Sequence, residues 1–397
     1  MAFVMKRPFG ASKGIVVFTH KETSTLSSSL SVLQRLLQRV RERYVVAVHY
    51  GWYSRIDGPP AWVDFHFAPE ATVVFAEPDR VRRIPMNSSY FVPSYFRPVK
   101  MPKQWDVISV TRPAPFKNTD QLLAALRVLK DMRPQSRALV VCATSQRSRT
   151  TGMLAGVERQ YQELFSPAER EDVVLLPFNL QGAPFPFPRR DVAFLYNASR
   201  LFTLFSKREG GSKAIKEALL CGLPLVLDAD LEGGGLEFAT AKNSRVFRGV
   251  KQAAERMAEV LDHSADFEFD TSGLARRISE TYTVPELMAH LARTFEELGI
   301  PFEGEVDTHE LGMKLPSHHS SLERDAKERG WAADLQTHRA AAAFLRGLLE
   351  SGQGDVVTPT PYEHLRMTAA DLRARAKRTA ARARVVTRRA AGRVLKA

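Results

Sequence analysis

The hydrophobic pattern at the start of the chain predicts a βαβ unit. Residues 14–19 and 44–49 are continuous apolar runs, typical of buried strands, and residues 27–40 between them place their apolar side chains on one helical face. Two shorter runs, at residues 72–75 and 89–93, predict two further strands. A strand, a helix and a strand in this order are typical of an α/β domain.

A second series of apolar runs lies beyond residue 100. Residues 105–120 predict a strand, then a loop, and then a helix that begins at residue 119 or 120. Further strands are predicted at residues 138–144, 172–178 and 201–206, and the first two of these are continuous and β-branched. Such runs are typical of parallel strands that are buried on both faces.

Two prolines in residues 98–102 predict a linker between domains. We therefore expect an abbreviated α/β domain over residues 1–98 and a second α/β domain over residues 99–300. Beyond residue 300 the composition shifts toward Ala, Arg and His, so residues 301–397 are expected to form a helical extension with a basic end.

A predicted helix start after residue 211 has the features of an anion site. Ser212 is a favourable N-cap, and residues 213–220 are strong helix formers. Gly210 and Gly211 precede the helix, and glycines let a ligand approach the free amides of a helix N-terminus. The amides from Gly211 to Lys213 are therefore expected to hold a phosphate group.

Two glutamates, Glu209 and Glu217, flank this helix start eight positions apart. Glu217 lies within about two turns of the N-terminus, where its carboxylate can accept hydrogen bonds from a sugar diol. Glu209 precedes the glycines and is expected to face the same site. The alternative is that both acids only complement the helix dipole.

A second glycine-rich loop follows at residues 230–237, after a glycine stop, a proline and the apolar run 225–227. We expect both loops at the same sheet edge.

Residues 206–224 resemble the signature of glycosyltransferase family 4. The family pattern is a glutamate, a glycine-bearing turn, a second glutamate eight positions on, and Cys-Gly-Leu-Pro before a strand, and each element is present here. The resemblance implies an α/β GT-B fold, in which two Rossmann-like domains face each other across a cleft. It also implies retention of the anomeric configuration, a nucleotide sugar as co-substrate, and neither a metal nor another cofactor.

The same resemblance assigns roles to residues elsewhere in the chain. Arg112 and Lys117 have the spacing of a family pair that grips the donor diphosphate, and fixed cations stabilise the charge of that leaving group. Gly233 and Gly234 match a family loop that borders the sugar and phosphate. A family histidine approaches the donor sugar from the first domain, and we prefer His49 over His20 for this role, the alternative being a structural histidine. The residues expected to bind the donor are Gly210, Gly211, Ser212, Lys213, Glu217, Gly233 and Gly234, and those expected to act in catalysis are Glu209, Arg112, Lys117 and His49.

The chain departs from the family in its first domain. About 98 residues hold fewer strands and helices than the family's acceptor-binding domain. The glycine-rich loop of the family after the first strand is replaced by the polar residues 20–29. The acceptor is therefore not identified by the resemblance.

Composition agrees with a globular enzyme. The 397 residues are 44% hydrophobic and 25% charged, which is ordinary for a chain with two or three cores. Without an apolar run near the roughly twenty residues that span a bilayer, and without a secretion signal, we expect a cytoplasmic location. The two cysteines and the adjacent His318 and His319 lack the spacing of a disulfide framework or a metal site.

Most of the basic excess lies in the C-terminal tail. Residues 371–397 contain ten Lys or Arg and one Asp, a net charge of +9 out of the chain's +13, which leaves +4 for the other residues. Such a tail favours attachment to an anionic membrane surface, at about 1 kcal/mol per basic residue near acidic lipids. The alternatives are binding of nucleic acid and a solvated helix.

The sequence therefore predicts a hexosyltransferase-like enzyme of class EC 2.4 that moves a sugar from a nucleotide diphosphate to an acceptor hydroxyl. A lipid-linked acceptor or a cell-envelope glycan would fit a peripheral position at the inner membrane face. Three alternatives remain open: a transferase acting on a modified DNA base, a GT-B isomerase of nucleotide sugars, and a non-catalytic binder of them.

Overall fold

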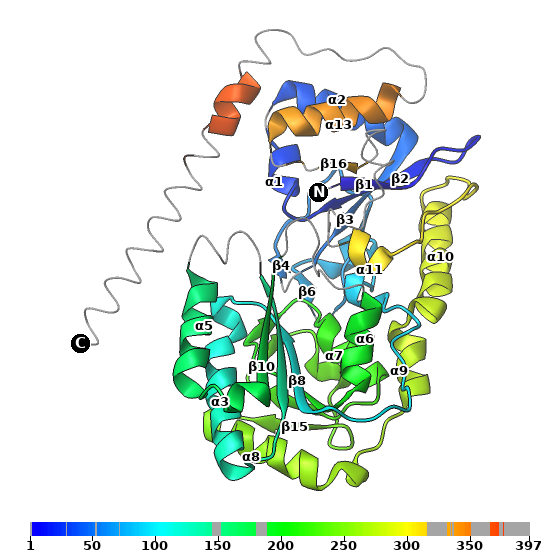
Figure 1. Cartoon of the computed structure of the whole chain (residues 1–397). Coiled ribbons are helices and arrows are strands. Elements are labelled where there is room, and N and C mark those ends of the chain that lie inside the picture. The colour runs from blue at the N-terminus through cyan, green and yellow to red at the C-terminus, as the bar shows by residue number, and fades with distance from the viewer. Residues whose placement is uncertain are drawn as a thin grey trace.

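The computed structural model in Figure 1 describes residues 2–28, 30–51, 54–70, 72–144, 152–179, 189–315, 332–333, 335, 337–350, 366–372 and 376. His318, His319 and nearly all of the basic tail lie outside these residues. In the described part of the chain, no helix has the length and apolarity to cross a membrane.

The chain forms two six-stranded sheets. The first has the strand order β16 (Ala332–Ala333), β1 (Ala2–Lys6), β2 (Gly14–Thr19), β3 (Tyr44–His49), β5 (Phe65–Phe67) and β7 (Arg83–Ile84). Strands β2, β3, β5 and β7 run parallel, while β1 is antiparallel to both of its neighbours. The helix α2 (Ser31–Arg43) connects β2 to β3, so the predicted βαβ unit is confirmed.

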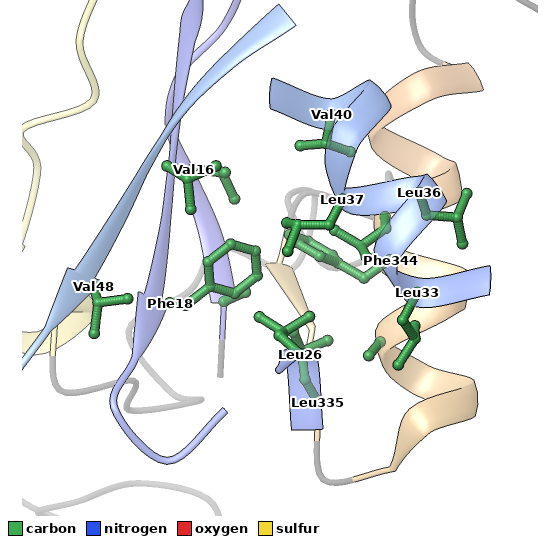
Figure 2. Packing of buried hydrophobic residues seen from close by; sticks show 14 of the residues in the cluster. Val16, Phe18, Leu26, Leu33, Leu36, Leu37, Val40, Val48, Leu335 and Phe344 are labelled. Carbon is green, nitrogen blue, oxygen red and sulfur yellow. The ribbon is translucent and has the colours of Figure 1, made fainter. Parts of the chain in front are cut away.

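Both faces of the first sheet are covered by helices from distant parts of the sequence. Helices α2 and α13 (His338–Glu350) lie side by side over one face (Figure 1), where Phe18 of β2 packs edge-on against Phe344 at 6.3 Å between ring centroids. Figure 2 shows Phe18 pointing from the sheet toward these helices. Helix α10 (Glu280–Glu297) packs on the other face. Burying a side chain as large as Phe18 contributes roughly 1.5–3 kcal/mol.

The described elements after residue 279 therefore pack on the first sheet. β16 adds a strand beside β1, α13 joins the core over α2, and α10 joins the core on the opposite face. The predicted boundaries at residues 98 and 300 stay predictions. The described part of the predicted extension, however, does not stand apart from the first sheet, because most of its large apolar residues are buried there, Leu372 being exposed.

The second sheet is parallel throughout. Its strand order is β10 (Val173–Asn179), β9 (Ala138–Thr144), β8 (Trp105–Thr111), β11 (Ser199–Leu204), β13 (Leu225–Asp228) and β15 (Ser244–Phe247). One face is covered by α3 (Thr119–Met132), α5 (Met153–Leu164) and α8 (Gly249–Asp262). The other face is covered by α6 (Arg189–Asn197), α7 (Lys213–Leu220) and α9 (Thr271–Ile278). Two helix-flanked sheets agree with the predicted α/β class.

Two local predictions need correction. Residues 89–93 do not form a strand, because the Asn87 side chain accepts a hydrogen bond from the Ser89 amide and starts the 3-10 helix η2 (Ser88–Tyr90). The predicted helix 27–40 begins only at Ser31, as α2, because Ser27 is the C-cap of a separate short helix, α1 (Thr23–Leu26). The strand predicted at residues 72–75 is confirmed as β6 (Val73–Phe75), which pairs with β4 (Ser54–Ile56) outside the first sheet.

Candidate functional site

The strand order of the second sheet defines where a ligand would bind. After β8 the chain continues to β9 on one side, whereas β11 and β13 are added on the other side, so the order reverses between β8 and β11. Ligands of open parallel sheets bind outside the carboxyl ends of the strands at such a point. The loop that follows β8 carries Arg112 and Lys117, and the loop that follows β11 carries Glu209.

The structure brings Lys117 and Glu209 into direct contact. Lys117 ends the 3-10 helix η3 (Pro115–Lys117), and its ammonium donates to Oε1 of Glu209, 92 positions away. The two side chains are 11% and 9% exposed. Burial lowers the pKa of Lys117, and the Glu209 carboxylate offsets part of that shift. The cation predicted for the diphosphate and the first glutamate of the motif therefore share one site.

Arg112 lies on the same loop as Lys117, and both cations contact the ring of Phe116. The guanidinium carbon of Arg112 is 5.5 Å from the ring centroid, and Nζ of Lys117 is 5.7 Å from it. The charge of Arg112 also contributes to the lowered pKa of Lys117. Arg112 is exposed, whereas Lys117 is largely buried, so the pair presents one accessible and one shielded positive charge.

The two glycine-rich loops lie against each other. β12 (Arg208–Glu209) pairs in parallel with β14 (Glu232–Gly233), and Gly234 donates its amide to the carbonyl of Glu209 at 3.2 Å. A Cβ atom on Gly234 would lie 3.0 Å from Cα of Gly211, so this approach requires glycine. The prediction that both loops lie at one sheet edge is confirmed.

Helix α7 begins at the predicted residue. Oγ of Ser212 accepts a hydrogen bond from the Ile215 amide at 3.5 Å, as expected of an N-cap. The Ser212 amide itself donates to the carbonyl of Gly234 at 3.3 Å. This amide was predicted to bind phosphate, and the structure instead uses it to join the two loops. Gly211 and Lys213 are the remaining amides of the predicted set.

The Lys213 side chain is engaged with the chain itself. Its ammonium donates to the carbonyl of Gly312 in α11 (Leu311–Lys314), which follows α10. Burial and the charge of Arg189 lower the pKa of Lys213 to about 7. The backbone amide of Lys213 and its side chain therefore serve different neighbours.

Glu217 has a partner that the sequence did not reveal. Nη2 of Arg189, the first residue of α6, donates to Oε1 of Glu217, and the two side chains are 13% and 9% exposed. The guanidinium of Arg189 also lies 5.3 Å from the ring centroid of Phe96. No feature near residue 189 in the sequence marks this contact, because α6 and α7 become neighbours only through packing on the second sheet.

His49 is fully buried at the carboxyl end of β3. Its Nε2 accepts a hydrogen bond from the Ser88 amide at 3.2 Å, so Nδ1 carries the ring proton. Within the described residues, that Nδ1 has no hydrogen-bond partner. Burial is the main reason that the pKa of His49 falls to about 3, with His20 and Lys213 adding to the effect. The ring is therefore neutral near pH 7.

A metal site is not evident in the part of the chain that the structure describes, because no three His, Cys, Asp or Glu side chains there are grouped to hold an ion. Arg112 and Lys117 supply positive charge at this site.

Comparison with solved structures places the chain beside glycosyltransferases of low sequence similarity. The similar structures include TarM, with 12% identity and a TM-score of 0.49 over 71% of this chain and 54% of that one. They also include the pneumococcal O-GlcNAc transferase GtfA in complex with UDP and GlcNAc, with 13% identity and a TM-score of 0.47 over 66% of this chain and 55% of that one. A glycosyltransferase from Rickettsia africae ESF-5 has 13% identity and a TM-score of 0.46 over 67% of this chain and 81% of that one.

The chain spans about half the length of the first two of these structures. No protein-family model matches the chain, and no curated protein matches it by sequence.

Proposed function

We propose that this protein is a GT-B glycosyltransferase of the group 1 type that transfers a sugar from a nucleotide diphosphate to an acceptor hydroxyl with retention of configuration. The observation that carries the proposal is the contact between Lys117 and Glu209. It joins the cationic loop after β8 to the glycine loop before α7 at the point where the strand order of a parallel sheet reverses.

Each group at the site has a role in this reaction. Arg112 and Lys117 stabilise the diphosphate as the bond between the sugar's anomeric carbon and the phosphate oxygen breaks. The amides of Gly211 and Lys213 bind the distal phosphate at the positive end of α7. Phosphate oxygens compete with the Glu209 carboxylate for the ammonium of Lys117. Glu209 is then released toward the sugar.

Glu217 binds the ribose diol through the carboxylate oxygen that does not accept from Arg189. The acceptor hydroxyl forms the new bond at the anomeric carbon on the face that the diphosphate leaves, and its proton passes to a diphosphate oxygen. No covalent nucleophile takes part. His49, at the end of β3 in the first sheet, donates a hydrogen bond from Nδ1 to the donor sugar.

The acceptor class follows from the tail. Residues 371–397 would hold the enzyme at an anionic lipid surface, which suits a lipid-linked acceptor or a cell-envelope glycan. Sedimentation with vesicles of phosphatidylglycerol, with zwitterionic vesicles and with duplex DNA as comparison arms, tests this part. Binding to DNA alone would replace the lipid proposal with a nucleic-acid acceptor.

A thermal-shift panel of UDP-, GDP-, ADP- and TDP-sugars tests the core of the proposal, because a ligand that binds only the folded state raises its melting temperature. We expect one donor to give a shift and, with water as the acceptor, slow release of the nucleoside diphosphate. Conversion of the donor alone into an epimer would show an isomerase. Binding without release or transfer would show a non-catalytic binder.

A further inference from the structure

A buried lysine lies directly behind the glycine loop and takes no part in the reaction described above. Lys216 is 0% exposed, and its Nζ donates to Oγ of Ser89 at 2.7 Å. The ammonium also lies over two aromatic rings, at 4.0 Å from the centroid of Tyr90 and 4.6 Å from that of Phe238. Its hydrogen-bond acceptor is the neutral Ser89 hydroxyl, and the Glu237 carboxylate acts on the ammonium as a nearby charge.

The hydroxyl of Ser89 passes this interaction on to the glycine loop. Ser89 accepts from Lys216 and donates to Oδ1 of Asn87 at 2.7 Å, and Nδ2 of Asn87 donates to the carbonyl of Gly210 at 3.3 Å. All three side chains are at most 2% exposed. The donors therefore run in one direction, from the ammonium of Lys216 to the carbonyl of Gly210.

The direction of the Gly210 carbonyl sets the direction of the next amide. A trans peptide is planar, and its C=O and N–H groups point in opposite directions. Holding the Gly210 oxygen toward Asn87 therefore directs the Gly211 N–H to the other side of the loop. The fit behind the loop is tight, because a Cβ on Gly211 would lie 2.8 Å from Oγ of Ser89.

The η2 turn that carries Ser89 is also held by the first sheet. The amide of Ser88 donates to Nε2 of His49, at the end of β3. The turn therefore has one contact with His49 and one with the glycine loop. It connects the two sheets at the candidate site.

We propose that Lys216, Ser89 and Asn87 form a relay of positioning residues that aims the Gly211 amide at the distal phosphate of the donor and fixes the glycine loop relative to His49. The inference rests on the proposed function, because it takes the glycine loop to be the phosphate site. The relay does not contact the donor.

Energetics favour this role over a purely structural one. A fully buried ammonium loses its hydration, and burial, opposed by Glu237 and assisted by Arg277, lowers the pKa of Lys216 to about 7. An apolar side chain of similar length would fill the same space between Tyr90 and Phe238 at no cost in desolvation. Replacing buried ionic groups by apolar ones is often neutral or stabilising.

The test separates nucleotide binding from stability in three variants: Lys216→Met, Ser89→Ala and the double variant. Melting temperatures and calorimetric titration with UDP, GDP, ADP and TDP are measured for each at pH 6.5. We expect Lys216→Met to retain or raise the melting temperature and to weaken binding of the preferred diphosphate about tenfold, which equals about 1.4 kcal/mol. Ser89→Ala should melt lower, because it leaves the ammonium without an acceptor, and the double variant should regain stability but not binding.

Lys130→Met is the matched control. Lys130 is also a buried lysine of the second sheet's helices, and it bonds Asp172 and the carbonyl of Ser136. This variant should lose stability and keep the affinity of the wild-type protein. Wild-type affinity in Lys216→Met, or affinity that follows the melting temperature across the variants, overturns the relay. A wild-type protein that binds none of the four diphosphates overturns the proposed function, and the relay with it.

Discussion

Removing the Glu217 carboxylate is expected to leave a buried guanidinium without its partner. The side chains of Arg189 and Glu217 are 13% and 9% exposed, and breaking a buried pair from one side costs about 3–5 kcal/mol. Because some water reaches both groups and Arg189 keeps its contact with Phe96, we expect Glu217→Ala to lose about 3 kcal/mol, at the lower end of this range. Because the unfolding entropy is about 2.1 cal/mol/K per residue, or about 0.8 kcal/mol/K for 397 residues, the melting temperature should fall by roughly 4 °C.

Urea denaturation of the wild type, Glu217→Ala, Arg189→Ala and the double variant measures the pair directly. Since either single change already removes the interaction, the double variant should lose about 2 kcal/mol less than the sum of the single losses. The exposed pair of Lys242 and Glu268 is the control, and Glu268→Ala should leave the urea midpoint within error. Additive losses for Arg189→Ala and Glu217→Ala would refute the reasoning.

The same pair decides how donor binding should be tested. Glu217→Ala changes stability and the proposed ribose contact together, so its melting temperature alone does not report on binding. Glu217→Gln keeps an oxygen that accepts from Arg189 and removes the charge. A loss of donor affinity in Glu217→Gln, measured well below its melting temperature, would isolate the ribose contact.

Lys117→Met is expected to lower the transfer rate about 10²–10³-fold, because it removes a cation from the leaving diphosphate; nucleotide release measures this, and a loss under about tenfold would contradict the role. Gly211→Ala, whose Cβ would lie 2.8 Å from Oγ of Ser89 at a φ of +155°, should cost about 1–3 kcal/mol of stability by urea titration and weaken diphosphate binding. Burial lowers the pKa values of His49 and His66 to about 3 and about 4, so the unfolded chain binds more protons than the folded chain below pH 6.5. The free energy of unfolding should therefore fall between pH 6.5 and 4, by up to about 1.4 kcal/mol per pH unit for each histidine. A urea midpoint that stays constant over this range would refute this. Truncation after residue 376 should abolish sedimentation with anionic vesicles at low salt, and release of the full chain by salt checks the electrostatic origin.

The local elements of the second sheet were predictable because each is encoded by neighbouring residues. The strand at residues 138–144 and the helix at residues 213–220 have the predicted bounds. A continuous apolar run and an N-cap followed by helix formers act within a few residues of the chain. The short strands β5 and β7 of the first sheet were not predicted, since two or three residues give too little pattern.

The pairing of Lys117 with Glu209 was predicted only as a shared site, by way of the family resemblance. The direct contact depends on β8 and β11 being neighbours, although two other strands lie between them in the sequence. The same holds for Arg189 with Glu217, where the order of helices on one face of the sheet creates the contact.

The amino-acid order determined the strands, the helix start at Ser212 and the glycines that let two loops meet, because hydrophobic periodicity, capping and backbone freedom are properties of short segments. Only the folded chain decided which cations meet which carboxylates, that residues 280–297 and 338–350 cover the first sheet, and that Lys216 lies behind the glycine loop. Those contacts join residues up to 326 positions apart, as for Phe18 and Phe344, and the free energy that selects them comes from burying both sheets at once, which no local pattern records.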